Sequence, residues 1–216
     1  ASDVYKRQPF ITRLLHHRSA AAASSGCLQS GHCSEPSRLL PGNGHAAPVK
    51  AHRLARFPRL PLLTQPTAIE PLDGLARHLG DALNGVRIYV KRDDVAGIGL
   101  GGNKLRKLEY LLGAARAEGA DTVVTVGAIQ SNHARLTAAA SAQAGLACEL
   151  FLTRSVPRQD PDYTGNGNRL LDDLFGATVH ELPGDADSLT AAEARAAELR
   201  EQGRRVYTFP SGLSLI

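Results

Sequence analysis

The chain has 216 residues, 43% of them hydrophobic, so it can bury a substantial core, with room for one complete domain and part of another. The net charge is +4, but the excess lies in residues 1–60, which hold 9 Lys and Arg against 2 Asp and Glu. The remainder is mildly acidic, so the charge gives no argument for a nucleic-acid partner. No apolar run approaches the roughly 20 residues that span a bilayer, which argues against a membrane protein.

Residues 1–50 form a leader of unusual composition. Residues 11–25 are rich in Arg and Ala and nearly free of acids, as an organelle transit peptide would be, and residues 24–48 are rich in Gly, Pro, Ser and His. We expect the leader to be disordered. Upstream DNA read through without a start codon would give the same composition, and we favour that interpretation over organelle import.

The two ends of the chain are related through the DNA that could encode them. Residues 3–8 can be written GAT GTG TAT AAG AGA CAG, and residues 213–216 can be written CTG TCT CTT ATA, which is the reverse complement of the last four of those codons. Both resemble the mosaic end used in transposon-based library preparation. We therefore expect residues 213–216 to be an adapter-derived tail and the natural sequence to run at most from about residue 9 to residue 212. The absence of Met agrees with a missing start.

From residue 87 onward, strand-like and helix-like segments alternate. We expect strands at residues 87–91, 122–126, 147–152, 178–181 and 206–209. We expect helices at residues 103–117, 132–144, 166–174 and 188–202, closed by Gly119, Gly145, Gly176 and Gly203. Such alternation predicts parallel strand pairing with right-handed crossovers. The expected fold class is α/β, a three-layer parallel sheet with flanking helices, in which ligands bind at the carboxyl ends of the strands.

Two polar motifs each follow one of these strands. The first is GGNKLRKLE, residues 101–109, which places Lys104 where a helix begins. Unpaired N–H groups at such an end attract anions, and a lysine in a partly desolvated pocket can be neutral enough to attack a carbonyl. The second is QSNHAR, residues 130–135, directly after the strand expected at 122–126. Together the motifs predict a site that holds a phosphate and a reactive carbonyl.

The two motifs resemble those of the pyridoxal-phosphate (PLP) enzymes of the tryptophan synthase β superfamily (fold type II). Within it they resemble the D-cysteine desulfhydrase and 1-aminocyclopropane-1-carboxylate (ACC) deaminase family. The resemblance runs from about Arg56, through Pro66-Thr67, Glu70-Pro71-Leu72 and Lys91-Arg92-Asp93-Asp94, to about Gly212. It implies a two-domain fold with PLP between the domains, truncated here at its C-terminus. Residues 51–212 would be an incomplete catalytic region, with the small domain within about 100–180.

The resemblance assigns roles residue by residue. Lys104 matches the catalytic lysine that holds PLP covalently, and Lys107 matches a lysine near the cofactor phosphate. Asn132 matches the asparagine that hydrogen-bonds the ring hydroxyl of the cofactor. Ser131, with the backbone around His133, matches the loop that receives the substrate carboxylate. We therefore expect Lys104 and Ser131 to be catalytic, Lys104, Lys107 and Asn132 to bind the cofactor, and Ser131, Asn132 and His133 to bind the substrate.

The activity implied for the full-length protein is β-elimination from a D-amino acid, which would convert D-cysteine to pyruvate, ammonia and hydrogen sulfide. Lys104 would act as the base at the α-carbon. His133 favours this reaction over the alternative, ring-opening deamination of ACC, because the deaminases usually carry glutamine there. The phosphate loop and the pocket tyrosines of the family would follow residue 212. We therefore expect the chain alone to be inactive or barely active, and a PLP-binding fragment without catalysis is a further alternative.

A nucleotide-dependent oxidoreductase is the third alternative. Residues 97–102 satisfy the G-x-G-x-x-G pattern of a dinucleotide-binding turn. However, residues 92–96 separate these glycines from the preceding strand. The acidic partner of the ribose should close the following strand, whereas Asp121 precedes it. This interpretation is therefore the weaker one.

Two side-chain pairs also suggest chemistry. Asp93 and Asp94 could be a catalytic carboxylate pair, but adjacent loop residues rarely face one group, so a turn or capping role is favoured. Ser131 and His133 could be a nucleophile and its base, but residues two apart on a helix do not face each other.

The remaining expectations concern surroundings and partners. Cys27, Cys33 and Cys148 lack metal-like spacing, so we expect no metal site and a reduced, cytoplasmic compartment, with Cys148 in the core. The expected partner is a small amino-acid substrate, with no nucleic acid and no membrane. The resemblance implies a homodimer for the full-length protein.

Overall fold

A computed structural model describes residues 53–210, which belong to one compact unit. The leader expected at residues 1–50 and the tail expected at 213–216 lie outside the described residues. The strands are β1 (Ile69–Pro71), β2 (Tyr89–Lys91), β3 (Thr122–Ala128), β4 (Ala147–Thr153), β5 (Thr178–Leu182) and β6 (Val206–Phe209). The helices are α1 (Asp73–Leu79), α2 (Leu105–Ala117), α3 (Asn132–Ala144), α4 (Pro161–Gly165), α5 (Asn168–Leu174) and α6 (Ser188–Glu201), with short 3-10 helices η1 (Arg53–Arg56), η2 (Gly80–Leu83), η3 (Asp93–Val95) and η4 (Ile98–Leu100).

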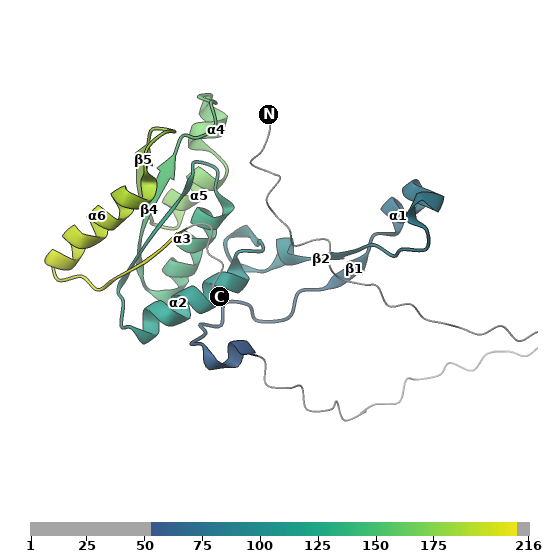
Figure 1. Ribbon diagram of the computed structural model, residues 1–216, viewed down its shortest axis with the longest axis horizontal. Helices are drawn as coiled ribbons and strands as arrows, with labels where there is room; N and C mark the ends of the chain where they lie inside the picture. Colours follow the sequence, from purple (N-terminus) through teal and green to yellow (C-terminus); the bar gives the residue numbers. More distant parts are fainter. Residues whose placement is uncertain (1–52, 211–216) are drawn as a thin grey trace, which may run out of the picture. The chain divides into compact units, whose positions relative to one another are not determined.

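The main sheet has 4 parallel strands in the order β5-β4-β3-β6 (Figure 1). In the first register position Thr122 of β3 lies opposite Ala147 of β4 and Val206 of β6. β3 is buried from Thr122 to Val126, which is typical of a central parallel strand covered on both faces. The predicted parallel α/β fold is confirmed.

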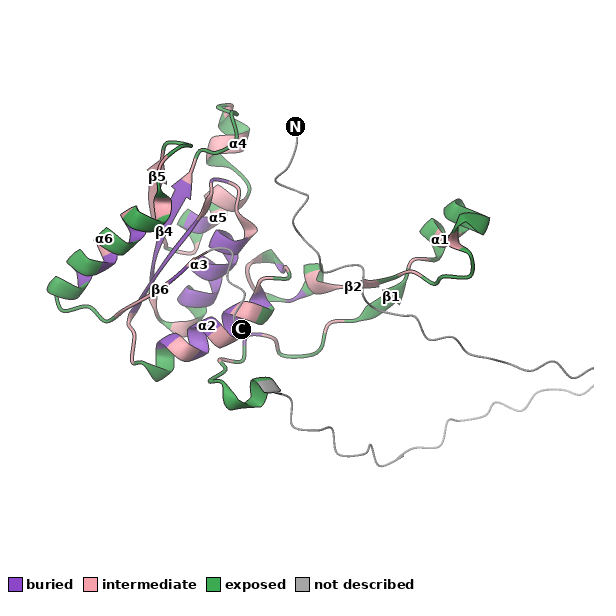
Figure 2. Ribbon diagram, viewed as in Figure 1, coloured by how far each residue is buried: buried purple, intermediate pink, exposed green. Residues whose placement is uncertain are grey.

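Helices cover both faces of this sheet. α6 packs on β3, β4 and β6, whereas α3 packs on the other face with α2 and α5 beside it. Figure 2 shows buried residues gathered along the strands and along the helix faces that meet them. On the side of α2 and α3 the fully buried side chains include Leu105, Leu108, Leu112, Ile129 and Leu136. Burying each leucine contributes about 1.5–3 kcal/mol, so the helical spacing of Leu105, Leu108 and Leu112 fixes which side of α2 faces the core.

Glu109 ties the segment before β1 to α2. Its buried carboxylate accepts hydrogen bonds from the backbone N–H groups of Leu62 and Leu63, each at 3.0 Å. It also forms an ion pair with Arg59 at 2.7 Å. The last residue of the GGNKLRKLE motif therefore serves the fold, because a buried carboxylate needs such partners.

Some elements differ from the expected ones. The strand expected at residues 87–91 is observed as β2, but the expectation that it pairs in parallel is wrong, because it pairs antiparallel with β1 in a separate two-stranded sheet. β1 was not predicted, because both strands are three residues long and largely exposed, so they lack an apolar pattern. The helix expected at 166–174 begins instead at Asn168. Gly167 precedes it with a φ of 60°, and the separate α4 ends at Gly165. The four glycines expected to close helices have φ values of 71–85° and do so, as at Gly145, whose N–H bonds to the carbonyl of Ala142.

Candidate active site

Lys104 lies at the N-terminal end of α2, immediately after a tight glycine turn. The N–H of Gly102 donates to the carbonyl of Asp93 at 2.7 Å, which fixes the end of the turn. A Cβ added at Gly101 would lie 2.0 Å from the carbonyl oxygen of Asp94, so no other residue fits there. Lys104 occupies the N-cap position, and its side chain makes no capping hydrogen bond. The chain therefore presents the lysine at the positive end of a helix, as the sequence predicts.

Lys107 shares this region with Lys104. Burial, followed by the charge of Lys104, lowers the pKa of Lys107 to about 8. An anion bound beside the two lysines would stabilise their charged forms and so oppose both causes of the lowered pKa. The chemistry of these donors thus fits the phosphate of a phosphorylated carbonyl compound such as PLP.

The QSNHAR motif begins α3 next to the glycine turn. Ser131 is the N-cap, and its Oγ accepts a hydrogen bond from the N–H of Ala134 at 3.2 Å. The hydroxyl hydrogen of Ser131 remains available to a ligand, as do the first-turn N–H groups of Asn132 and His133, which have no intrahelical acceptor. The side chain of Asn132 approaches Asn103, with 3.4 Å between Nδ2 and Oδ1. The two motifs therefore meet at one place, with helix N-termini from both.

His133 is turned into the core. It is 2% exposed, and its Nε2 lies 3.1 Å from the hydroxyl of Thr125. Burial, followed by the charges of Lys107 and Lys104, lowers the pKa of His133 to about 3, so the imidazole is neutral. Its Nδ1 has no hydrogen-bond partner among residues 53–210. The ring packs edge-on against Phe209, with 5.8 Å between centroids.

The suggested nucleophile and base do not meet. Ser131 caps α3 through its hydroxyl, whereas His133 bonds to Thr125.

Asp93 and Asp94 face different groups. Asp93 accepts hydrogen bonds from Thr67 at 2.7 Å and from Arg106 at 2.6 Å and 2.9 Å. These bonds, with that of Arg106 the strongest influence, lower the pKa of Asp93 to about 2. Asp94 pairs with Arg92 at 2.8 Å on the surface. The two carboxylates are structural, and Arg106 of the first motif, to which sequence reasoning gave no role, anchors the turn before α2.

The dinucleotide interpretation conflicts with the packing of the same glycines. A Cβ added at Gly99 would lie 2.6 Å from Cβ of Ala139 in α3, so the turn is in direct contact with that helix. The carbonyl groups of Gly99 and Gly101 accept hydrogen bonds from the guanidinium of Arg135. A pyrophosphate needs open space and N–H donors at such a turn. Here the space beside the turn is occupied by α3 and by the guanidinium of Arg135.

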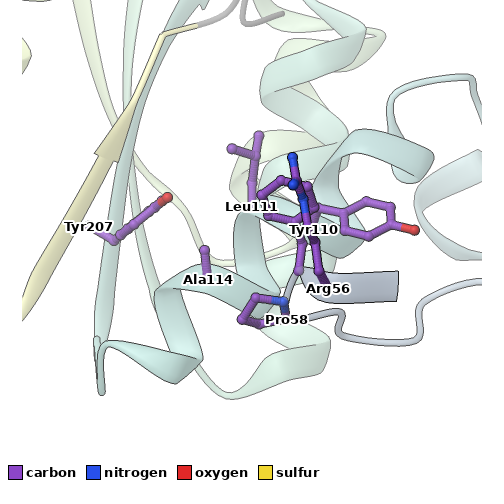
Figure 3. Close-up of a pocket in the computed structure, with 7 residues that line it drawn as sticks. Arg56, Pro58, Tyr110, Leu111, Ala114 and Tyr207 are labelled. Atoms are coloured by element: carbon purple, nitrogen blue, oxygen red, sulfur yellow. The ribbon is translucent and has the colours of Figure 1, made fainter. Parts of the chain in front are cut away.

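A cavity of about 380 Å³ lies elsewhere, between α2 and β6 (Figure 3). Tyr207 of β6 faces Leu111 and Ala114 of α2 across it, and Arg56 and Pro58 lie at its side. Its walls contain neither Lys104 nor Lys107, so this cavity is separate from the candidate site. Among residues 53–210 no cluster of His, Cys, Asp and Glu could hold a metal ion, and no helix is long and apolar enough to cross a bilayer.

Fold and site together define an α/β protein that presents a lysine and anion donors at the starts of two neighbouring helices, α2 and α3, of which α3 follows the parallel strand β3. The family described as pyridoxal-phosphate dependent enzyme matches residues 60–214. The chain belongs to this family, whose cofactor is PLP, and the expected family and cofactor are confirmed.

Individual relatives within this family are similar to the chain over most of its length. The D-cysteine desulfhydrases of Salmonella paratyphi B and Salmonella newport are each 46% identical over 161 residues, which is 74% of this chain and 48% of theirs. A crystal structure of an ACC deaminase homologue is 42% identical, with a TM-score of 0.62 over 73% of this chain and 45% of that one. The chain thus spans about half the length of the curated relatives it matches.

Proposed function

We propose that the whole protein catalyses PLP-dependent β-elimination from D-cysteine, which releases hydrogen sulfide, and that hydrolysis of the remaining three-carbon product yields pyruvate and ammonia. The observation that carries the proposal is the position of Lys104 at the start of α2, beside Lys107 and next to the start of α3. The Salmonella desulfhydrases at 46% identity support the choice of reaction.

Three residues would hold the cofactor. Lys104 would hold its carbonyl carbon covalently through Nζ, Lys107 would face its phosphate, and Asn132 would donate to its ring hydroxyl. When bound, PLP supplies an electron sink for the charge that develops at the α-carbon. The substrate carboxylate would lie at the hydroxyl of Ser131 and the N–H groups of Asn132 and His133. Once the amino group of the substrate has displaced Nζ of Lys104, the freed Nζ would take the α-proton, and the thiol would leave from the β-carbon.

Ring-opening of ACC to 2-oxobutanoate and ammonia is the second candidate. The observation that favours it is the structural similarity to an ACC deaminase homologue at 42% identity. His133 favours the desulfhydrase, as in the sequence-based prediction. The two reactions are distinguished by their products, since only D-cysteine releases sulfide.

We further propose that the whole protein is a cytoplasmic homodimer. The cytoplasmic location rests on the few cysteines of the sequence, which lack metal-like spacing. Cys148 is buried in β4, and burial raises its pKa to about 12, so it is an inert core thiol. Analytical ultracentrifugation of the whole protein tests the dimer.

The test of the cofactor site is borohydride reduction of the purified chain after incubation with PLP, followed by mass mapping of the labelled peptide. We expect the label on Lys104. The Lys104→Arg variant should lose it, and the matched control Lys91→Arg, which replaces an exposed lysine outside the proposed site, should keep it. A label spread over surface lysines, or kept in Lys104→Arg, contradicts the proposed site. Sulfide and pyruvate release by the whole protein then tests the reaction.

A further inference from the structure

Arg135, the last residue of the QSNHAR motif, is a buried cation in the first turn of α3. It is 8% exposed, and every hydrogen bond it makes goes to a neutral acceptor: the carbonyl oxygens of Gly99 and Gly101, the latter at 2.8 Å, and Oδ1 of Asn168 at 3.0 Å. Burial lowers its pKa, and the opposing influence comes from Asp172. Arginines are rarely buried without a directly bonded carboxylate, so this position calls for an explanation.

The backbone turn that Arg135 binds, residues 99–102, has an unusual conformation. Gly99, Leu100, Gly101 and Gly102 all have positive φ, of 55°, 63°, 69° and 136°. The N–H groups of Gly101 and Gly102 bond to the carbonyls of Ile98 and Asp93, but the run does not continue as a regular helix or strand. Leu100 has the left-handed backbone conformation, which residues with a side chain disfavour. Only the carbonyls of Gly99 and Gly101 are turned toward the guanidinium. Arg135 therefore supplies the donors that this turn needs, and Lys104 follows it by two residues.

The guanidinium of Arg135 is also linked, through Asn168, to the first residue of its own motif, Gln130. Asn168, which accepts from Nε of Arg135, donates from Nδ2 to the carbonyl of Gln130 at 3.0 Å. Its backbone N–H donates to Oε1 of Gln130 at 2.9 Å. Gln130 directly precedes Ser131, so one side chain joins the turn before Lys104 to the loop before α3.

We propose that Arg135 is the positioning residue of the cofactor site, which fixes the glycine turn and with it the separation between Lys104 and the start of α3. The importance of this role for catalysis rests on the proposed function. Arg135 acts through the backbone of residues 99–102 and does not itself take part in the chemistry. The planar guanidinium fork can serve the turn and Asn168 together, whereas an ammonium group presents its donors from a single point.

The test compares Arg135→Lys with Arg169→Lys. The control replaces another largely buried arginine, which pairs with Asp173 and Glu181 and does not touch the turn. The first readout needs no cofactor: amide hydrogen exchange at Gly101 and Gly102, whose N–H groups are bonded to Ile98 and Asp93. We expect about tenfold faster exchange in Arg135→Lys and no change at these amides in Arg169→Lys. The second readout is borohydride labelling at Lys104 with PLP, which should slow by roughly tenfold.

Unchanged exchange at Gly101 and Gly102 in a folded Arg135→Lys protein overturns the proposal. If that variant does not fold, Asn168→Ala decides, because it releases the far end of the guanidinium: faster exchange at the turn supports the proposal and wild-type exchange overturns it. If the wild-type chain takes no label on Lys104, the proposed function fails, while the exchange comparison still decides the role of Arg135.

Discussion

His133 donates a hydrogen bond from Nε2 to the hydroxyl of Thr125 over 3.1 Å. The direction follows from a third group, because Thr125 gives its only hydroxyl hydrogen to the carbonyl of Phe209 at 2.6 Å, and a carbonyl cannot donate. Thr125 must therefore accept from the histidine. The proton of the neutral ring is on Nε2, and Nδ1 carries a lone pair. This relay connects the first turn of α3 to the end of β6.

Replacing Thr125 with Val tests the relay. The variant leaves Nε2–H of His133 and the carbonyl of Phe209 without their partner, which we expect to cost about 1–3 kcal/mol in the free energy of unfolding. Urea denaturation measures that loss, and ¹⁵N NMR of the histidine ring identifies which nitrogen carries the proton. The control is Thr137→Val, since Thr137 is also buried but donates to the backbone carbonyl of His133 and does not touch its ring. A wild-type NMR signature with the proton on Nδ1 contradicts the assignment.

Replacing Lys104 with Gln should raise the pKa of Lys107 above its value of about 8. The rise should be partial, because burial is the larger cause of the lowered pKa and the charge of Lys104 is the smaller one. The pKa can be followed by NMR of ¹³C-methylated lysines. Inorganic phosphate should shift it in the same direction in the wild-type chain. A Lys107 pKa that is unchanged in the Lys104→Gln variant would mean that the two ammonium groups do not share a site.

Asp172 should make the stability depend on pH. Its side chain is fully buried, neither carboxylate oxygen has a hydrogen-bond partner among residues 53–210, and burial raises its pKa to about 7. A carboxyl with a raised folded-state pKa favours folding while it is protonated, so the free energy of unfolding should fall as the pH rises from about 4 to 7 and level off above that. From pH 5 to pH 8 this amounts to at most about 3 kcal/mol.

The Asp172→Asn variant should lose most of this dependence in urea unfolding at pH 5 and pH 8. Asp173→Asn is its control, because Asp173 is a neighbouring, more exposed carboxylate that pairs with Arg169 at 2.6 Å. Equal pH profiles for wild type and Asp172→Asn contradict the assigned pKa.

Periodicity in the sequence predicted the elements of the parallel sheet, because a buried parallel strand is a continuous apolar run and α2, α3 and α6 bury apolar residues at helical spacing. It failed for β1, α1 and α4, which have no buried residues and therefore no such pattern. The local position of Lys104 could likewise be predicted, because a glycine turn and a helix start are local features.

The contacts that hold the site could not be predicted from the sequence. Arg135 bonds to a turn 34 residues earlier, and Arg106 to Asp93 across 13 residues. Such pairs depend on how α2 and α3 pack, which no local pattern encodes. The inward orientation of His133 was missed for the same reason, since its partner Thr125 lies on the neighbouring strand. The roles of Lys104, Lys107, Ser131, Asn132 and His133 stay predictions.

Asp93 should hold the segment that contains Thr67 against the turn before Lys104. Its pKa of about 2 lies below the usual value for aspartate, so its contribution is present above about pH 4 and is lost as the pH falls through 2. Asp93→Asn should cost about 1–2 kcal/mol in the free energy of unfolding at pH 7, allowing for the exposed guanidinium of Arg106. Asp94→Asn, which removes only a surface pair with Arg92, should leave it unchanged. Thermal unfolding at pH 7 and pH 3 measures both, and equal effects of the two substitutions would show that Asp93 is an ordinary surface carboxylate.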